Sequence, residues 1–575
     1  MNVQEHILLT ALGTRADDAY YSLNEVIGNG RLSPIALMQI LPPEKRPHRI
    51  IALCTKGALK TTFPVLESGV SVPVEAVSIP EGRTEEELWD ILHLILEQAS
   101  PGTRMTLELT QGFRSYPFLF FTAALFLRAL RGVDIQAVYY GMLEGKYENV
   151  DGLKVAPVVD LYPVLEMIEW FYATRMFKET GQAQLLSACL APFETPPAGL
   201  EREERRDYSQ VKRLRENVNL FAMKYAQSLP LELGLKSAEL VGRLSNPVPG
   251  HLRSKMPVPE EIFRAIHEFV EPFAIPHKQK EGKQTISCDS SELFRQAGMI
   301  DTYIEKGYLN YALGLIREWI VTAAMWQAST ENNSNWLVYK DRMVTERRLG
   351  AMAMLLKNHP SRLLDNQRWL AGHWDYLSDC RNNLHHHGFR EKNAFHGEDK
   401  VNKIKHCWQE LKDSLLDKQR WNTKIAGGGG KLLVTPLGLS RGLLYSALRH
   451  INPDKLLVLT SKEMSGEIDE IISVSGWTGE KLPPFVMEDP HSGFGEVKNA
   501  TGAANNYLLD ADQVYINITG GTTALQYLVQ EICKTAQKFN REVLQVAMVD
   551  RRTPKQQKEE PYVQGELIPL NNNCT

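Results

Sequence analysis

The chain has 575 residues and a formal net charge of -4 at pH 7, which is long enough for three or four domains. Hydrophobic residues make up 43% of it and charged residues 23%, as in globular proteins with a buried core. The near-neutral net charge argues against a protein that coats nucleic acid through bulk electrostatics, while a local basic groove remains compatible with it.

Residues 1–160 alternate between short apolar runs and amphipathic stretches. The apolar runs, each ending near a glycine, lie at 7–12, 49–54, 104–110 and 133–140, and helical patterns cover 85–97 and 117–130. Buried strands that alternate with helices are typical of a mostly parallel sheet covered on both faces. The first domain is therefore predicted to be a Rossmann-like α/β domain.

From 161 to 424 the strand pattern disappears and helical periodicity replaces it. Helices are expected at 161–179, 207–227, 259–270, 292–305, 308–327, 366–379 and 400–417. This region is predicted to be all-α.

A glycine-rich linker at 425–430 precedes a return to strand and helix alternation in 431–575. Strands are expected at 431–438, 455–461, 513–519 and 542–549, with helices at 440–451 and 522–539. Both ends of the chain open with a strand that ends in Leu-Gly, and both carry a later strand that ends in threonine and glycine before a helix. The pattern suggests two Rossmann-like domains of related design, and two unrelated α/β domains are the alternative.

The strand–glycine–helix junctions are candidate ligand sites. Ligands of open parallel sheets bind beyond the carboxyl ends of the strands, where glycine allows close approach and a helix start favours phosphate. One junction holds Thr110, Gln111, Gly112 and Arg114, and the other holds Thr519, Gly520, Gly521 and Thr522. Neither is a G-x-G-x-x-G or Walker A motif, so NAD binding and ATP hydrolysis are disfavoured. A tight turn with no ligand is the alternative at each.

A second candidate site lies at the end of the 366–379 helical pattern, in the segment R-N-N-L-H-H-H-G. Asn382 and His386 are four residues apart and would share a helix face, with Arg381 on the preceding position. An arginine that holds phosphate and a histidine that transfers protons suit metal-free RNA cleavage. Metal binding by the three histidines is disfavoured because adjacent positions diverge on a helix, and a helix C-cap before Gly388 is the other alternative.

These motifs together resemble a known family. Arg381-Asn382-x-x-x-His386 matches the R-x4-6-H motif of HEPN ribonucleases, and 108–114 (E-L-T-Q-G-F-R) resembles the D-x-T-H-G-x-R signature of CRISPR-associated CARF proteins, with Glu for Asp and Gln for His. Residues 311–318 also resemble a helix of the family's HEPN region. The resemblance covers about residues 1–420 and is to CARF–HEPN ribonucleases of type III CRISPR systems.

The resemblance implies a homodimer or higher oligomer that binds a cyclic oligoadenylate, with cyclic tetra-adenylate the expected ring, and then cleaves single-stranded RNA without a metal or other cofactor. The activator would be held near Gly13 and Thr14 together with the first junction. Two HEPN domains would form one cleft in which Arg381, Asn382 and His386 act. The product would carry a 2′,3′-cyclic phosphate.

Residues 517–521 (N-I-T-G-G) resemble a second CARF-type signature, which some ring nucleases carry. Those enzymes often place lysine shortly after the glycines, whereas this chain has Thr522 and Thr523. Arg441 or Arg551, at neighbouring strand ends, could supply the positive charge. Residues 431–575 are thus expected to bind the activator, with cleavage of it left open.

The expected location is the cytoplasm, with no membrane association. The seven cysteines include no C-x-x-C pair, which indicates reduced thiols, and no uncharged apolar stretch reaches about 18 residues. The alternatives in function are a non-catalytic ligand-responsive regulator or scaffold, and a ring nuclease with a vestigial HEPN domain.

Overall fold

The computed structural model describes residues 5–149, 151–254, 256, 258–276, 282–329, 336–358, 360–386, 398–423, 430–538 and 542–570. Contacts within the chain group into two compact units. One comprises Met1–Ala226 and Glu239–Glu271, and the other comprises Gln227–Ala238 and Pro272–Thr575. The division falls inside the predicted helical region, and the domain boundaries drawn from the sequence at 160, 424 and 430 follow a change of element type and stay a prediction.

The first unit begins with a sheet in the order β3-β2-β9-β7-β6-β1-β4-β5, with β8 beside β9. Its parallel centre consists of β1 (His6–Leu12), β4 (Arg49–Cys54), β5 (Val74–Ser78), β6 (Arg104–Glu108) and β7 (Asp134–Gly141). The antiparallel contacts come from β2 (Ala19–Leu23), β3 (Val26–Gly30), β8 (Tyr147–Glu148) and β9 (Lys154–Asp160). The predicted mostly parallel sheet is confirmed, while β2, β3, β5, β8 and β9 were not predicted.

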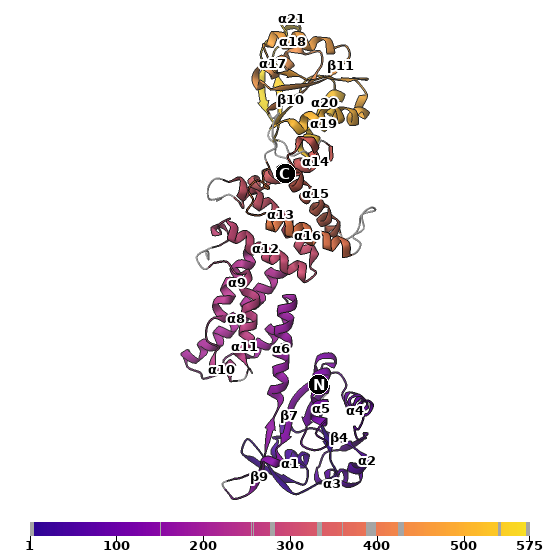
Figure 1. Ribbon diagram of the computed structural model, residues 1–575, viewed down its shortest axis with the longest axis vertical. Helices are drawn as coiled ribbons and strands as arrows, with labels where there is room; N and C mark the ends of the chain where they lie inside the picture. The colour runs from indigo at the N-terminus through magenta and orange to yellow at the C-terminus, as the bar shows by residue number, and fades with distance from the viewer. Residues whose placement is uncertain are drawn as a thin grey trace. The chain divides into compact units, whose positions relative to one another are not determined.

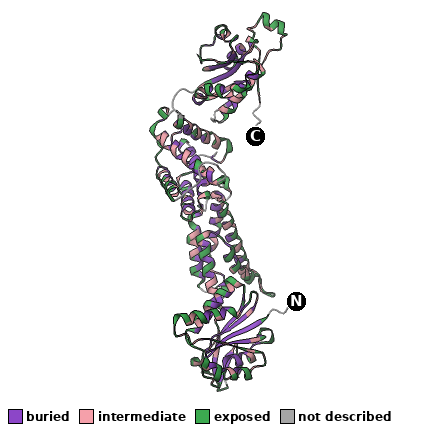
Figure 2. Ribbon diagram, turned by 90° about the vertical axis from the view of Figure 1, so that its right-hand side faces the viewer, coloured by how far each residue is buried: buried purple, intermediate pink, exposed green. Residues whose placement is uncertain are grey.

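Helices cover both faces of this sheet. On one face α4 (Glu85–Glu97) and α5 (Tyr116–Arg131) share a core with β1, β4, β6 and β7. On the other face lie α1 (Ser33–Ile40), α2 (Lys56–Thr61) and α3 (Phe63–Gly69) (Figure 1). The central strands β1, β4 and β6 are almost entirely buried (Figure 2), which explains why their sequences are nearly continuous apolar runs.

The helical region follows in both units. The first unit contains α6 (Tyr162–Thr180), α7 (Gln184–Leu190), α8 (Arg202–Ala226), α10 (Gly250–Arg253) and α11 (Pro259–Val270), and α9 spans Pro230–Leu244. The second contains α12 (Ser290–Glu305), α13 (Leu309–Ala328), α14 (Tyr339–Asn358), α15 (Asp365–His385) and α16 (Glu398–Asp413). All seven predicted helices are present, and α9 and α14 are the long helices that were not predicted.

A second sheet in the second unit has the order β12-β11-β10-β14-β15-β16, with β13 beside β11. Its strands are β10 (Lys431–Leu437), β11 (Lys455–Ser461), β12 (Glu480–Lys481), β13 (Phe485–Met487), β14 (Gln513–Asn517), β15 (Glu542–Val549) and β16 (Glu566–Pro569). The helices α17 (Arg441–Ile451) and α18 (Ile468–Ser475) lie on one face, opposite α19 (Val497–Asp510) and α20 (Thr523–Lys538) (Figure 1). The second predicted α/β domain is confirmed.

The two sheets share one plan down to the residue register. Thr10 of β1 lies opposite Glu108 of β6, and two residues later Leu12 lies opposite Cys54 of β4. In the second sheet the pairing of β10 places Thr435 beside Asn517, and Leu437 lies opposite Thr460 of β11. Both parallel centres are also followed by an antiparallel strand, β9 beside β7 and β16 beside β15. Matching register across three strands favours the related design over two unrelated domains.

Candidate functional site

The first candidate site lies where the chain order reverses in the first sheet. Among the parallel strands, β4 and β5 lie on one side of β1, and β6 and β7 lie on the other side. The carboxyl ends of β1 and β6 carry Gly13 and Gly112, and a Cβ on Gly13 would lie 3.5 Å from the backbone nitrogen of Gly112. This reversal point is where open α/β sheets bind ligands. The structure therefore brings the two predicted glycine loops together.

The other residues predicted here surround the glycine pair. The Oε1 atom of Gln111 would lie 4.0 Å from a Cβ on Gly13, and Thr14 would touch a Cβ on Gly57 at 3.0 Å, so the start of α2 joins the group. Thr14 and Arg114 are exposed, and Gln111 is half-buried. Gly112 has φ +93°, a left-handed conformation that favours glycine.

Beneath these loops lies a buried polar network that sequence reasoning did not find. The side chain of Glu108 is completely buried and accepts hydrogen bonds from Thr10 Oγ1 at 2.7 Å, Ser33 Oγ at 2.8 Å and the Thr110 backbone N–H at 3.0 Å. Burial raises the pKa of Glu108, and these hydrogen bonds partly offset that effect. Hydroxyl residues within otherwise apolar strands were the available signal.

The side chain of Thr110 belongs to this network. Its hydroxyl accepts the Gly141 N–H at 2.7 Å and donates to Ser33 Oγ at 3.1 Å. Both hydrogen-bonding functions of the hydroxyl hold the loop after β6 in place, and the role of Thr110 in ligand binding stays a prediction.

The second sheet repeats the same network with an amide in place of the carboxyl group. Asn517 Nδ2 donates to Thr435 Oγ1 at 2.9 Å, and Asn517 Oδ1 accepts from Thr519 N–H at 3.1 Å and Thr519 Oγ1 at 2.7 Å. The Thr519 hydroxyl accepts the Met548 N–H at 2.8 Å, as Thr110 accepts from Gly141. Asn517 and Thr519 therefore correspond to Glu108 and Thr110.

The glycines of the second junction lie at the reversal point between β10 and β14. A Cβ on Gly438 would lie only 2.5 Å from Gly521 Cα, so the two backbones touch. Gly520 and Gly521 have φ +103° and +70°. Thr522 caps α20 by accepting the Leu525 N–H at 3.3 Å, and its hydroxyl also contacts the Pro490 carbonyl oxygen. The cap occupies one backbone donor that a phosphate would otherwise use.

The two arginines suggested as a source of charge for this junction are engaged elsewhere. Arg441 forms ion pairs with Glu467 at 2.8 Å and Glu470 at 3.9 Å. Arg551 forms an ion pair with Glu566 on β16 at 2.9 Å. Carboxylates already neutralise both guanidinium groups, so the expectation that either one supplies charge to a phosphate here is not supported.

The candidate nuclease residues lie in the last turn of α15. Arg381 Nη1 donates to Asn382 Oδ1 at 3.1 Å, and Arg381 Nε is buried without a hydrogen-bond partner among the described residues. His386 is the exposed C-cap, and its backbone N–H donates to the Asn382 carbonyl oxygen at 3.1 Å. A hydrogen bond thus links Arg381 to Asn382. His386 lies at the end of the helix, a position that also agrees with the alternative in which this segment only caps the helix.

The neighbouring helix α13 borders this turn. The Nε2 atom of His385 would lie 3.8 Å from a Cβ on Gly314 of α13. Arg317 lies over the ring of Trp374 at 5.2 Å and forms ion pairs with Glu318 and Glu346. His387 lies outside the described residues. Within the described ranges, no three His, Cys, Asp or Glu side chains group closely enough to hold a metal ion.

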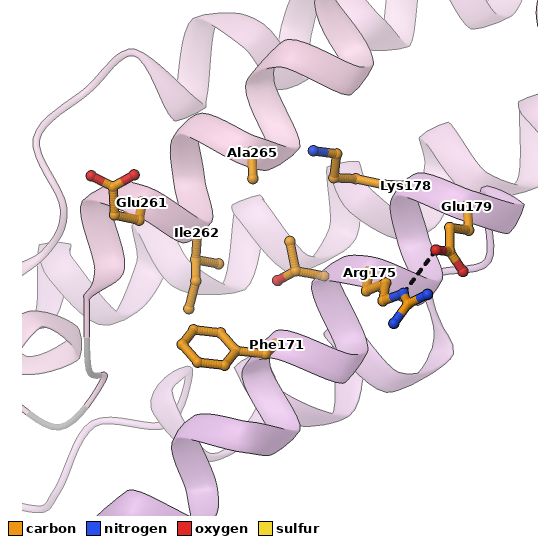
Figure 3. Close-up of a pocket in the computed structure, with 8 residues that line it drawn as sticks. Phe171, Arg175, Lys178, Glu179, Glu261, Ile262 and Ala265 are labelled. Carbon is orange, nitrogen blue, oxygen red and sulfur yellow. Dashed lines mark hydrogen bonds and ion pairs between the residues drawn. The ribbon is translucent and has the colours of Figure 1, made fainter.

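A cavity of about 360 Å³ lies between α6 and α11 of the first unit (Figure 3). Phe171 and Ile262 line it, and Arg175 at its edge forms an ion pair with Glu179 at 2.8 Å. The hydroxyl of Thr174, which also lines it, is buried without a hydrogen-bond partner in the described part of the chain. None of the predicted site residues borders this cavity.

Among the described residues, the structure contains no helix of the length and apolar character that crossing a membrane would require.

Comparison with known proteins gives one relative in sequence. No family model matches the chain. Over 145 residues the chain is 31% identical to the CRISPR-associated protein MJ1674 of Methanocaldococcus jannaschii, a stretch that covers 24% of this chain and 22% of that protein. The chain thus spans less than a quarter of the length of this relative.

Two solved structures show distant likeness. Enterococcus italicus Csm6 bound to cyclic hexa-2′-fluoro-hexa-dAMP has a TM-score of 0.31 and 10% identity, over 72% of this chain and 95% of that one. A type III CRISPR defence DNA nuclease activated by cyclic oligoadenylate has a TM-score of 0.17 and 13% identity, over 94% and 65% of the two chains. Scores this low do not determine the fold or function of this chain. By sequence, the chain is a relative of a CRISPR-associated protein over about a quarter of its length.

Proposed function

We propose that this chain is a cyclic-oligoadenylate-activated, metal-independent endoribonuclease of type III CRISPR antiviral defence. The observation that carries the proposal is the last turn of α15, where Arg381 is joined to Asn382 and His386 stands exposed at the helix end. The sequence relationship to a CRISPR-associated protein supports it, as does the resemblance of both motifs to CARF–HEPN ribonucleases.

In this proposal the 2′-hydroxyl of single-stranded RNA attacks the adjacent phosphorus, and the 5′-oxygen leaves. His386 transfers protons, and Arg381 stabilises the charge that develops on the phosphoryl oxygens. The hydrogen bond to Asn382 holds the guanidinium group of Arg381 in one orientation. Two copies of the chain would form the complete cleft as a homodimer, each supplying one set of these residues.

The regulatory part of the proposal places the activator at the reversal points of the sheets. Gly13 and Gly112 in one sheet, and Gly438 and Gly521 in the other, bring two backbone segments close together at the strand ends with no side chain between them. A cyclic oligoadenylate has one phosphate per nucleotide and can use exposed N–H groups and cations there. We propose binding of this ligand at both junctions, with cyclic tetra-adenylate as the first ring to test.

The test is RNA cleavage by the purified chain in EDTA, with and without cyclic tetra- and hexa-adenylate. Arg381→Ala and His386→Ala should each reduce activated cleavage by about 10²–10⁴-fold, since each removes charge stabilisation or a proton-transfer group. His385→Ala, which lacks the R-N-x-x-x-H spacing, is the matched control. Undiminished cleavage by both variants would remove the HEPN site from the mechanism.

A second candidate function is that residues 431–575 degrade the activator. The repeated polar network favours ligand binding there. The pairing of Arg441 and Arg551 with carboxylates favours binding without cleavage. Incubating the full-length His386→Ala chain with cyclic tetra-adenylate and following linear products separates these outcomes.

A further inference from the structure

A lysine residue occupies the same register position in each of the two sheets. Leu12 of β1 lies opposite Cys54 of β4, and Leu437 of β10 lies opposite Thr460 of β11. Two residues beyond these partners, the chain reaches Lys56 in the first sheet and Lys462 in the second. A hydroxyl residue precedes each lysine, Thr55 in one case and Ser461 in the other.

These positions border the two reversal points. Lys56 follows β4, which pairs with β1, the strand that leads into Gly13. Lys462 follows β11, which pairs with β10, the strand that leads into Gly438. In the first sheet the start of α2 reaches the site, because a Cβ on Gly57 would touch Thr14 at 3.0 Å. Parallel strands bring their carboxyl ends to one edge of a sheet, so both lysines lie at the ligand-binding edge.

Lys56 and Lys462 differ in their surroundings from Arg441 and Arg83, two arginines near these edges. Both are exposed, and within the described residues neither ammonium group has a hydrogen-bond or ion-pair partner. Arg441 is paired with Glu467, and Arg83, in the loop after β5, is paired with Glu81. An unpaired ammonium group at a strand end is available to a phosphate without breaking an internal ion pair.

We infer that Lys56 and Lys462 are phosphate-binding residues, one for each sheet, and that Lys462 supplies the positive charge that Thr522 and Thr523 lack. The inference rests on the proposed binding of a cyclic oligoadenylate at these junctions. Because the strand register of the two sheets is related, we expect Lys56 and Lys462 to bind phosphate in the same way.

The test measures binding of cyclic tetra- and hexa-adenylate to the full-length chain by calorimetry, and activated RNA cleavage beside it. Lys56→Ala and Lys462→Ala should each weaken one class of site by roughly tenfold to a hundredfold, the loss expected for a charged hydrogen bond, and the double variant should weaken both. Lysine-to-arginine variants should restore most of the affinity. Lys45→Ala and Lys558→Ala are controls, since they remove exposed lysines elsewhere on the same domains.

The possible results separate two failures. If the unmodified chain binds neither ring, the proposed activator is wrong. If it binds while the double lysine variant binds equally well, the inference about Lys56 and Lys462 is overturned. Equal losses from the two control variants would also overturn it, because they would indicate general surface attraction, which falls with salt, rather than a specific contact.

Discussion

At the scale of single residues, Glu108 and Asn517 show that the same hydrogen-bond network can form around a carboxyl group or an amide group. Both lie at the same register position, and both receive the N–H of the threonine two residues later. Asn517 also donates to Thr435, whereas Thr10 must donate to Glu108. Because a hydroxyl rotates to serve as donor or acceptor, the two networks close equally well. Only the carboxyl group, however, incurs the cost of burying a charge.

Glu108→Gln should therefore stabilise the protein at neutral pH, by roughly 2–4 °C in Tm, the shift that about 1 kcal/mol produces in a domain of ordinary size. Folding raises the pKa of Glu108 through burial. The carboxyl group thus favours the folded state below the ordinary glutamate pKa, and this contribution is lost as the pH rises through the folded-state pKa. The Tm difference between the variant and the unmodified chain should be largest near pH 7 and shrink towards pH 4.

Glu108→Leu is the control for that experiment. It removes the charge but leaves Thr10, Ser33 and the Thr110 N–H without an acceptor, so it should lower the Tm at every pH. A Tm difference for Glu108→Gln that does not vary with pH would show that the carboxyl group does not titrate as proposed.

At the scale of elements, the glycines after β1 and β10 are constrained to different degrees. A Cβ on Gly13 would meet Gly112 at an ordinary contact distance of 3.5 Å, while a Cβ on Gly438 would lie 2.5 Å from Gly521 Cα. Gly112 tolerates no side chain, since φ is +93° and a Cβ would lie 2.8 Å from Tyr116. Substitution of Gly112 would therefore perturb folding as well as binding.

Gly13→Asp is the better probe of the first junction. It should weaken activator binding by at least about tenfold, because it places a negative charge where phosphate is proposed to lie, while the Tm changes by less than about 2 °C. Binding is measured by calorimetry and folding by thermal melting. Gly298→Asp, at an exposed open position of α12, is the control for added charge. Normal activation by Gly13→Asp at normal ligand concentration would place the site elsewhere.

At the scale of the whole molecule, the chain carries the same hydrogen-bond network at both ends, beside the strand ends where we propose ligand binding. Full-length protein should show two classes of cyclic-tetra-adenylate site, and a chain that ends at residue 423 should keep one. Its RNA cleavage should still switch on. If residues 431–575 degrade the activator, the shortened chain should stay active for longer.

The same comparison tests whether those residues act in another way. The Arg362 side chain contacts Asp510 of α19, which also binds Lys455 at 2.5 Å, so removing 431–575 breaks a contact with the segment before α15. A change in activation or assembly with unchanged activator lifetime would indicate a sensor or a dimer clamp. If the shortened chain keeps both classes of binding site, residues 431–575 do not contain a ligand site.

The sequence by itself determined the element types and the helical pattern of the centre. Apolar runs such as 49–54 became buried parallel strands, and the 3.6-residue period located seven helices, because burial on one stripe or on two faces leaves a local pattern. The hairpin of β2 and β3 escaped prediction. Its turn at Asn24 and Glu25 uses positive φ at both positions without glycine, so the usual turn signal is absent.

Tertiary structure alone decided which residues meet. Thr10, Ser33 and Glu108 are distant in sequence and form one network, and no local pattern encodes a hydrogen bond between separate strands. The same holds for the contact of Gly438 with Gly521 and for the carboxylates that engage Arg441 and Arg551. Periodicity reports how each segment is buried, whereas strand register and ion pairing depend on neighbours that only the folded sheet supplies.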